Sequence, residues 1–144
     1  METGRKAIAK LLDMPEEKAE IDRYLYTLDY PDEIKAWKFI GKTDPALRRY
    51  QDKLYYPPSA LISLMDLTTE LLFRNRFNRP GAIPALIAND SRFRKPVMPE
   101  DELLIQVKLL RNYKGRIGIF SGVIVDREGD IVAENISKGT IVKI

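Results

Sequence analysis

The sequence contains no cysteine and no histidine. Without cysteine the chain can form neither a disulfide nor a thiolate zinc site. Without histidine it lacks the only side chain that titrates near neutral pH when unperturbed, and also the commonest nitrogen ligand for zinc. Any proton transfer must therefore depend on Asp, Glu, Tyr, Lys or Ser side chains, or on backbone groups. We expect neither a metal ion nor another cofactor.

Long apolar runs are also absent, since no stretch approaches the roughly 20 residues that a membrane span needs. The first six residues, METGRK, lack the apolar segment of a secretory signal, so the cytoplasm is the expected compartment. The net charge is only +3, from 24 basic and 21 acidic residues. Nucleic-acid binders usually carry a concentrated basic patch with interleaved aromatics. We expect no nucleic-acid partner, whereas the local basic clusters are compatible with an acidic one.

The residues that are present indicate a folded domain with an α+β order of elements. With 144 residues, 44% of them hydrophobic, the chain can bury a core without disulfides. Residues 6–12 are predicted to form a short amphipathic helix. The β-branched and aromatic residues of 21–28, a turn signal, and the alternation of apolar and polar residues in 34–40 predict a hairpin.

A long helix is predicted at about residues 59–76, with Ser59 as its N-cap. Residues 60–67 are apolar almost all round, which indicates a buried helix rather than one on the surface. A polar stripe remains at helical spacing, made of Ser63, Asp66, Glu70 and Arg74. The last two are four residues apart and can form an ion pair.

After this helix the pattern changes to an alternation with period two. Strands are predicted at residues 83–93, 103–112, 116–126 and 131–143, and the segments between them are rich in turn residues. Their order predicts a four-strand meander. The expected fold is therefore an antiparallel sheet wrapped around a long central helix, in one domain of residues 1–144. Such an architecture by itself indicates no function.

Three segments resemble the 3-hydroxyacyl-acyl-carrier-protein dehydratases. Residues 91–103 (SRFRKPVMPEDEL) are similar to that family's ARFRRPVVPGDQL. Residues 21–23 (IDR) resemble its VDR strand, and residues 58–62 (PSALI) resemble PGVLI at the start of its buried helix. The resemblance covers essentially the whole chain. It implies the hot-dog fold, in agreement with the pattern-based prediction.

The catalytic residues of that family are not retained. Its members use a histidine in a GHFPG loop to remove the proton on the substrate's α-carbon, and a glutamate on the other subunit's central helix for the departing hydroxyl. Here the histidine position is Tyr50, the glutamate position is Leu64, and a helix glutamine one turn later is Thr68. A phenol with a pKa near 10 is ionised to about one part in a thousand at pH 7. The resemblance thus implies a protein that binds acyl thioesters with impaired or no dehydratase activity.

Asp66 keeps a catalytic alternative open. Residues 64–68 (LMDLT) are similar to the LADTA helices of hot-dog thioesterases, where a carboxylate activates water or attacks the thioester, although the preceding histidine–glycine–glycine is missing here. Asp66 also lies about 200° round the helix from Leu64, away from the expected site. A structural acid, paired across a dimer or with Arg74, is the competing interpretation. Asp52, in the loop of the histidine position, is a second candidate base.

Backbone groups at the start of the long helix are a further candidate site. The N–H groups of Ala60 and Leu61 are expected to be free, and with the helix dipole behind them they can polarise a thioester carbonyl. The resemblance implies the same role for this position, although Ser59 replaces a glycine. Ser59 otherwise acts simply as an N-cap.

Basic residues and one apolar strand suggest partners. The resemblance implies that Arg92, Arg94 and Lys95 flank the tunnel mouth, where they would meet an acidic acyl carrier protein or the phosphate of phosphopantetheine. A solvated basic strand end is the alternative. Members of the family dimerise through the strand after the central helix, here about residues 83–89, whose apolar edge needs covering. We therefore expect a homodimer, or a hetero-oligomer with an active homologue.

Three functional hypotheses follow. The first is a divergent dehydratase-like protein that binds acyl-carrier-protein or coenzyme A thioesters in fatty-acid or related acyl metabolism. The second is an active thioesterase or dehydratase that uses Asp66 or Asp52 as its base, with Tyr50 assisting. A purely structural subunit is the third, and it predicts no apolar tunnel.

Overall fold

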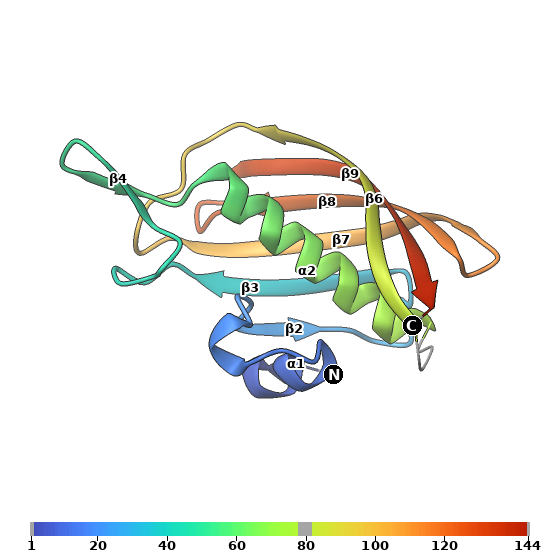
Figure 1. The fold of residues 1–144 in the computed structure, drawn as a ribbon. Coiled ribbons are helices and arrows are strands. Elements are labelled where there is room, and N and C mark those ends of the chain that lie inside the picture. The colour runs from blue at the N-terminus through green and yellow to red at the C-terminus, as the bar shows by residue number, and fades with distance from the viewer. Residues whose placement is uncertain (1, 78–81, 144) are drawn as a thin grey trace.

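The computed structural model describes residues 2–77 and 82–143. Within them a seven-stranded antiparallel sheet curves around one long helix, α2 (Pro58–Phe77), as Figure 1 shows. A short helix, α1 (Arg5–Leu11), and a 3-10 turn, η1 (Glu16–Lys18), lie near the first strands. The strands of the large sheet, in spatial order, are β1 (Glu2–Gly4), β2 (Arg23–Leu25), β3 (Glu33–Phe39), β7 (Glu102–Tyr113), β8 (Ile117–Val125), β9 (Ile131–Lys143) and β6 (Ala82–Phe93). The predicted fold class, a sheet wrapped around a central helix, is confirmed.

Helix α2 is buried on the side that faces the sheet. Its buried residues are Ala60, Leu61, Leu64, Met65, Thr68, Leu71, Leu72 and Phe73. They recur every three or four residues and so form one stripe along the helix, and each fully buried leucine contributes about 2 kcal/mol. The prediction of Ser59 as N-cap is wrong, because α2 begins at Pro58, whose fixed φ suits the first helical position. Among the described residues, no helix combines the length and apolarity that crossing a membrane requires.

Strand β6 departs from the predicted meander. Strands β7, β8 and β9 follow one another in the sheet, but β6 pairs with β9, and β7 pairs with β3. The four-strand meander is therefore wrong at its first strand. The link after β6 contains Pro96 and Pro99, which cannot extend a strand ladder, and it carries the chain across to β7. As a result β6 lies at an edge of the described sheet.

The segment before α2 contains a second, two-stranded sheet. Strands β4 (Arg48–Tyr50) and β5 (Lys53–Tyr55) pair antiparallel around a turn in which Gln51 has a φ of 54°. Figure 1 shows this hairpin reaching away from the large sheet. Tyr56 then returns to the body, where it forms a bridge with Val97. The hairpin therefore holds its turn residues away from the core.

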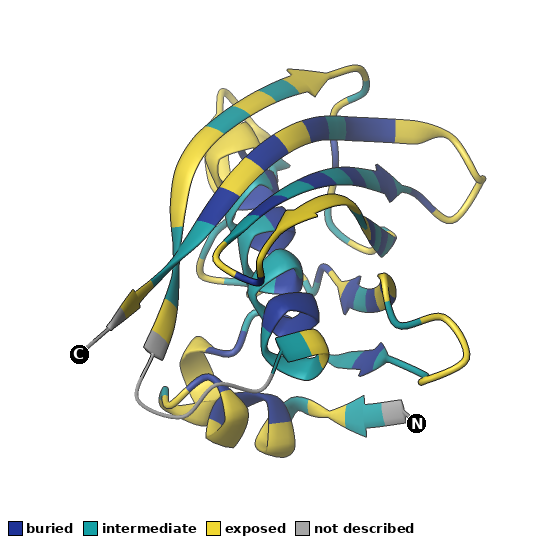
Figure 2. Cartoon of the chain, turned by 90° about the vertical axis from the view of Figure 1, so that its right-hand side faces the viewer, coloured by how far each residue is buried: buried dark blue, intermediate teal, exposed yellow. Residues whose placement is uncertain are grey.

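Strand β3 shows how the sheet builds the inner face. Its residues alternate between buried and more exposed positions, which is the period-two pattern visible along the strands in Figure 2. Ile34, Ala36 and Ile40 are buried. Lys38 lies in the same register and is only 6% exposed, so a charged group enters the interior from this strand.

Candidate active site

The positions that match the dehydratase catalytic residues do not meet in one site. Tyr50 is 71% exposed on the projecting hairpin. Leu64 is fully buried in the core, and the hydroxyl of Thr68, also fully buried, donates to the carbonyl oxygen of Leu64 at 2.7 Å. Asp52 is exposed on the same hairpin as Tyr50, where water solvates its carboxylate. A solvated phenol and a buried hydrocarbon offer no acid–base pair for dehydration.

Asp66 lies where α2 faces β6, at a cavity of about 140 Å³. Its Oδ1 is buried and has no hydrogen-bond partner among the described residues. The walls nearby are largely apolar and include Leu67, Phe73, Leu86 and Phe120. Burial raises the pKa of the Asp66 carboxyl, because the charged form loses hydration without gaining a partner. This carboxylate therefore accepts a proton more readily than an exposed aspartate.

The ion pair on the next turn of α2 does not include Asp66. Arg74 lies 3.2 Å from Glu70, which is the i,i+4 pair predicted from the spacing. The pairing of Asp66 with Arg74 is therefore wrong, whereas its pairing across a dimer stays a prediction. A partly desolvated carboxylate beside a cavity is the arrangement expected of a general base.

The amides at the start of α2 are engaged within the helix. The N–H groups of Ala60 and Leu61 both donate to the carbonyl oxygen of Pro57, at N···O distances of 2.9 and 3.3 Å. The prediction that these two groups are free is wrong, because Pro57 closes the first turn. Ser59 is exposed beside them. Neither the Ala60 nor the Leu61 amide is available here to polarise a carbonyl.

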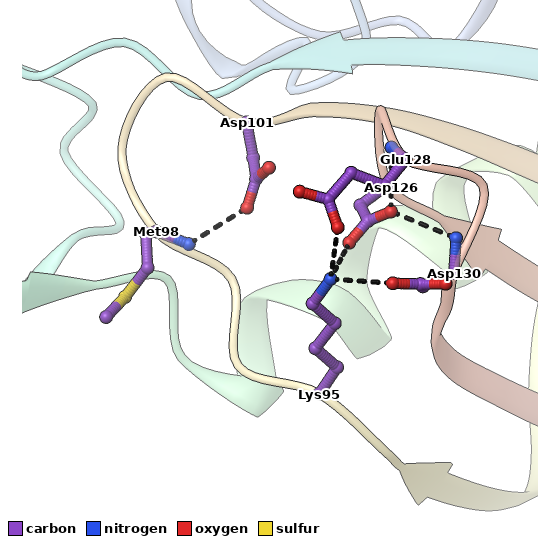
Figure 3. Close-up of polar contacts among 6 residues, drawn as sticks. All are labelled: Lys95, Met98, Asp101, Asp126, Glu128 and Asp130. Carbon is purple, nitrogen blue, oxygen red and sulfur yellow. Dashed lines mark hydrogen bonds and ion pairs between the residues drawn. The ribbon is translucent and has the colours of Figure 1, made fainter.

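The basic segment after β6 is held by acidic residues of the same chain. Lys95 Nζ lies 2.7 Å from Asp126, 3.3 Å from Glu128 and 2.9 Å from Asp130, as Figure 3 shows. The hydrogen bond with Asp126 is the main reason why the pKa of Lys95 rises, and it lowers the pKa of Asp126. These carboxylates are close enough together to hold a metal ion, but the ammonium group of Lys95 lies among them. The cluster instead fastens the turn between β8 and β9 to the chain after β6.

The two arginines of the segment differ. Arg94 pairs with Glu134 on β9, whereas Arg92 is exposed and forms no ion pair with any described residue. Arg92 borders a depression of the sheet together with Lys108. Of the three basic residues predicted at the tunnel mouth, Arg92 alone keeps an unpaired charge within the described parts of the chain.

Sequence reasoning missed a polar cluster beside α2. Lys38 and Asp44 form an ion pair at 3.2 Å, with both side chains 8% exposed. Glu20 has a buried oxygen, Oε2, without a hydrogen-bond partner in the described residues. A signal was present: Lys38 lies between Ile34 and Ile40 in the buried register of its strand, and a buried lysine needs a partner. None of the residues predicted to form the site lines the cavity of this cluster.

Comparison with known proteins decides the fold. No family model matches the chain. A curated relative, the 3-hydroxyacyl-acyl-carrier-protein dehydratase FabZ of Vibrio vulnificus, is 29% identical over 118 residues, covering 78% of this chain and 75% of that protein. Zebrafish thioesterase superfamily member 2 superposes with a TM-score of 0.73 at 9% identity, covering 94% of each chain. The chain has the hot-dog fold.

A second solved structure of this fold contains coenzyme A. A hypothetical thioesterase of Streptococcus pneumoniae, solved with coenzyme A, superposes with a TM-score of 0.68 at 13% identity, over 83% of this chain and 89% of that one. Hot dogs of both kinds, a dehydratase and thioesterases, thus resemble this chain. At such identities the solved structures establish the architecture, and the chemistry must come from the residues that line the cavities.

Proposed function

We propose that this hot dog binds acyl thioesters and hydrolyses them with Asp66 as general base. The observation that carries the proposal is the buried, unpartnered Oδ1 of Asp66 at an otherwise largely apolar cavity on the central helix. The similarity of residues 64–68 to thioesterase helices supports it. So does the coenzyme A in the solved structure of the pneumococcal relative.

The reaction needs one proton acceptor that later returns the proton. The carboxylate of Asp66 takes a proton from a water molecule, and the water oxygen forms a bond to the thioester carbonyl carbon. The carbon–sulfur bond then breaks, and the leaving sulfur takes the proton from the Asp66 carboxyl. The products are a carboxylic acid and a free thiol. A cavity of about 140 Å³ has room for a water molecule and the reacting atoms, since water occupies roughly 30 Å³ in the liquid.

Binding without turnover is the second candidate. It is favoured by the 29% identity to a dehydratase in combination with Tyr50 and Leu64 at the catalytic positions. Such a protein would hold a thioester on acyl carrier protein or coenzyme A, as a partner of an active homologue or as a binding module. An acidic carrier or a phosphate could meet exposed basic residues that form no ion pair with a described residue, namely Arg92 and, on the projecting hairpin, Arg48, Arg49 and Lys53.

The proposal includes a homodimer of one-domain chains in the cytoplasm. Strand β6 is an edge strand of the described sheet, and Ile83, Leu86 and Ile87 are exposed on it. A second copy that pairs there would cover these apolar side chains. Because Leu86 also lines the cavity of Asp66, the partner would lie beside the proposed site. Sedimentation of the wild-type chain and of Leu86→Lys tests this part, and a monomeric wild type would contradict it.

Hydrolysis is tested by following free thiol and enoyl product with plain acyl and 3-hydroxyacyl thioesters of coenzyme A and of acyl carrier protein. We expect thiol release, and a loss of at least about 100-fold in Asp66→Asn, the usual scale for a general base. Asp52→Asn is the matched control, since this acid is exposed on the hairpin. Enoyl product, or thiol release undiminished in Asp66→Asn, would refute the assignment. Tight binding without thiol release would establish the second candidate.

A further inference from the structure

A second cavity adjoins the first across Leu67, which lines both. It has a volume of about 880 Å³ and lies between η1, the end of β3, the loop that holds Asp44, and the face of α2 that carries Ser63. Ligand pockets typically measure about 300–1,000 Å³. The cavity at Asp66, with about 140 Å³, lies below this range, whereas this neighbour lies within it.

An ion pair enters this cavity from the sheet. Lys38 Nζ lies 3.2 Å from Oδ2 of Asp44, and Oδ1 of Asp44 accepts the N–H of Ala46 at 2.9 Å. Both oxygens of Asp44 are therefore engaged, and the carboxylate is fixed. An ammonium group has three N–H donors, and Lys38 directs one of them to Asp44. The buried side chain of Lys38 thus retains donors for a further acceptor in the cavity.

Glu20 supplies a hydrogen-bond acceptor to the same cavity. Its Oε2 is buried and unpartnered among the described residues, and Glu20 lines the same cavity. Burial raises the pKa of the Glu20 carboxyl, while Lys38 lowers it and Asp44 raises it. Tyr56 stands in the same wall, and burial, followed by the charges of Glu20, Asp44 and Asp22, raises the pKa of its hydroxyl. Tyr56 therefore remains protonated, and the unmet groups are the Lys38 donors and the Glu20 acceptor.

We propose that this cavity receives the acyl group of the thioester and selects acyl groups with a hydroxyl remote from the thioester carbon. A hydroxyl both accepts and donates a hydrogen bond, so one group can accept from Lys38 and donate to Glu20. A terminal carboxylate has no proton to donate to Glu20, and a terminal ammonium has no acceptor for Lys38. A plain alkyl end would displace water and leave buried polar groups unsatisfied.

This inference rests on the proposed function, because the acyl group is placed by a thioester that reacts at Asp66. Its test nevertheless does not require turnover. Binding is measured by calorimetry with the Asp66→Asn protein and acyl coenzyme A thioesters of equal length that end in methyl, hydroxyl, ammonium or carboxylate. We expect the hydroxyl compound to bind about 10- to 100-fold more tightly than the methyl compound, the scale of one hydrogen bond to a charged group.

Glu20→Leu, made in the same background, should narrow the hydroxyl-to-methyl ratio to about one. Glu16→Gln is the matched control, because this exposed acid on η1 does not line the cavity, and it should leave the ratio unchanged. Equal binding of the methyl and hydroxyl compounds would show a cavity that merely holds water and would overturn the inference. Preference for the ammonium compound, or a preference retained in Glu20→Leu, would also overturn it.

The two proposals fail in different ways. Thiol release that depends on Asp66 without any hydroxyl preference removes this inference alone. Hydroxyl-selective binding without thiol release removes hydrolysis alone. If Glu20→Leu does not fold, as judged by thermal melting, the wild-type residue at position 20 still decides the matter through the four-compound series.

Discussion

Asp66 and Glu20 are both partly buried carboxylates, but their surroundings differ. Asp66 and Glu20 each have one oxygen without a hydrogen-bond partner among the described residues, and burial raises the pKa of both. Asp66 faces largely apolar side chains, whereas Glu20 shares its cavity with Lys38 and Asp44. A carboxylate without a counter-charge is suited to taking a proton, and one beside an ammonium group is suited to recognition. Function here follows from the neighbours of a carboxylate and not from its burial.

The largest expected effect would come from removing the ammonium group of the polar cavity. Lys38→Met should lower the free energy of unfolding by about 3–5 kcal/mol, because it leaves Asp44 buried without its partner. The double variant Lys38→Met/Asp44→Leu should recover most of the loss, since it removes both charges. Urea denaturation measures both. A single variant as stable as the wild type would mean that the pair is not buried in solution, and the contrast between the cavities would disappear.

The pH dependence of thiol release tests the role of Asp66. Only the ionised form of Asp66 accepts a proton, so turnover should rise as the pH passes upward through its pKa. Burial raises that pKa, so the acid limb should lie above the value near 3.9 of an exposed aspartate. The limb is read from kcat/KM against pH. An acid limb at or below the ordinary value would show that the base is a solvated acid and not Asp66.

Replacing Asp66 by Asn should raise the stability of the protein although it lowers the activity. A pKa raised on folding means that the stability linked to this group is complete below its unfolded pKa and is lost as the pH rises through the folded one. Above the folded pKa the carboxylate is ionised and this contribution is gone. Asp66→Asn should therefore raise the free energy of unfolding by about 1 kcal/mol at pH 7, the scale of one unsatisfied buried group. Melting curves at pH 7 and at acid pH should show the gain shrinking on the acid side.

The sequence predicted the elements whose pattern is long and regular. Strand β8 alternates strictly between buried and half-buried residues, and α2 repeats its apolar stripe from Ala60 to Phe73, which is about four turns of helix. The partner of β6 was not predictable in this way, because alternation fixes which face is buried and leaves open which strand lies alongside. Strands β4 and β5 were missed because three residues each are too few to display a period.

The site was predicted less well than the fold, for a different reason. Asp66 was singled out by the resemblance of residues 64–68 to thioesterase helices, and the Glu70–Arg74 pair by its spacing. The bonds of the Ala60 and Leu61 amides, in contrast, depend on geometry at the atomic scale. Glu20 and Asp44 lie in connecting segments, where no period indicates which way a side chain points. Lys38 was the exception, because the alternation of β3 places it inside.

The smallest expected effect concerns Thr68, a buried polar residue of α2 that lines neither cavity. Its hydroxyl already donates to the carbonyl oxygen of Leu64, so it has no unmet bond to offer a ligand. The loss of one such hydrogen bond costs about 0.5–1.5 kcal/mol, so Thr68→Val should lower the free energy of unfolding by about 1 kcal/mol. Thiol release should change by less than about twofold. A loss of turnover comparable to that of Asp66→Asn, with the melting temperature unchanged, would mean that this family position still contacts the substrate and that an unmet hydrogen bond is not what distinguishes the reactive residues.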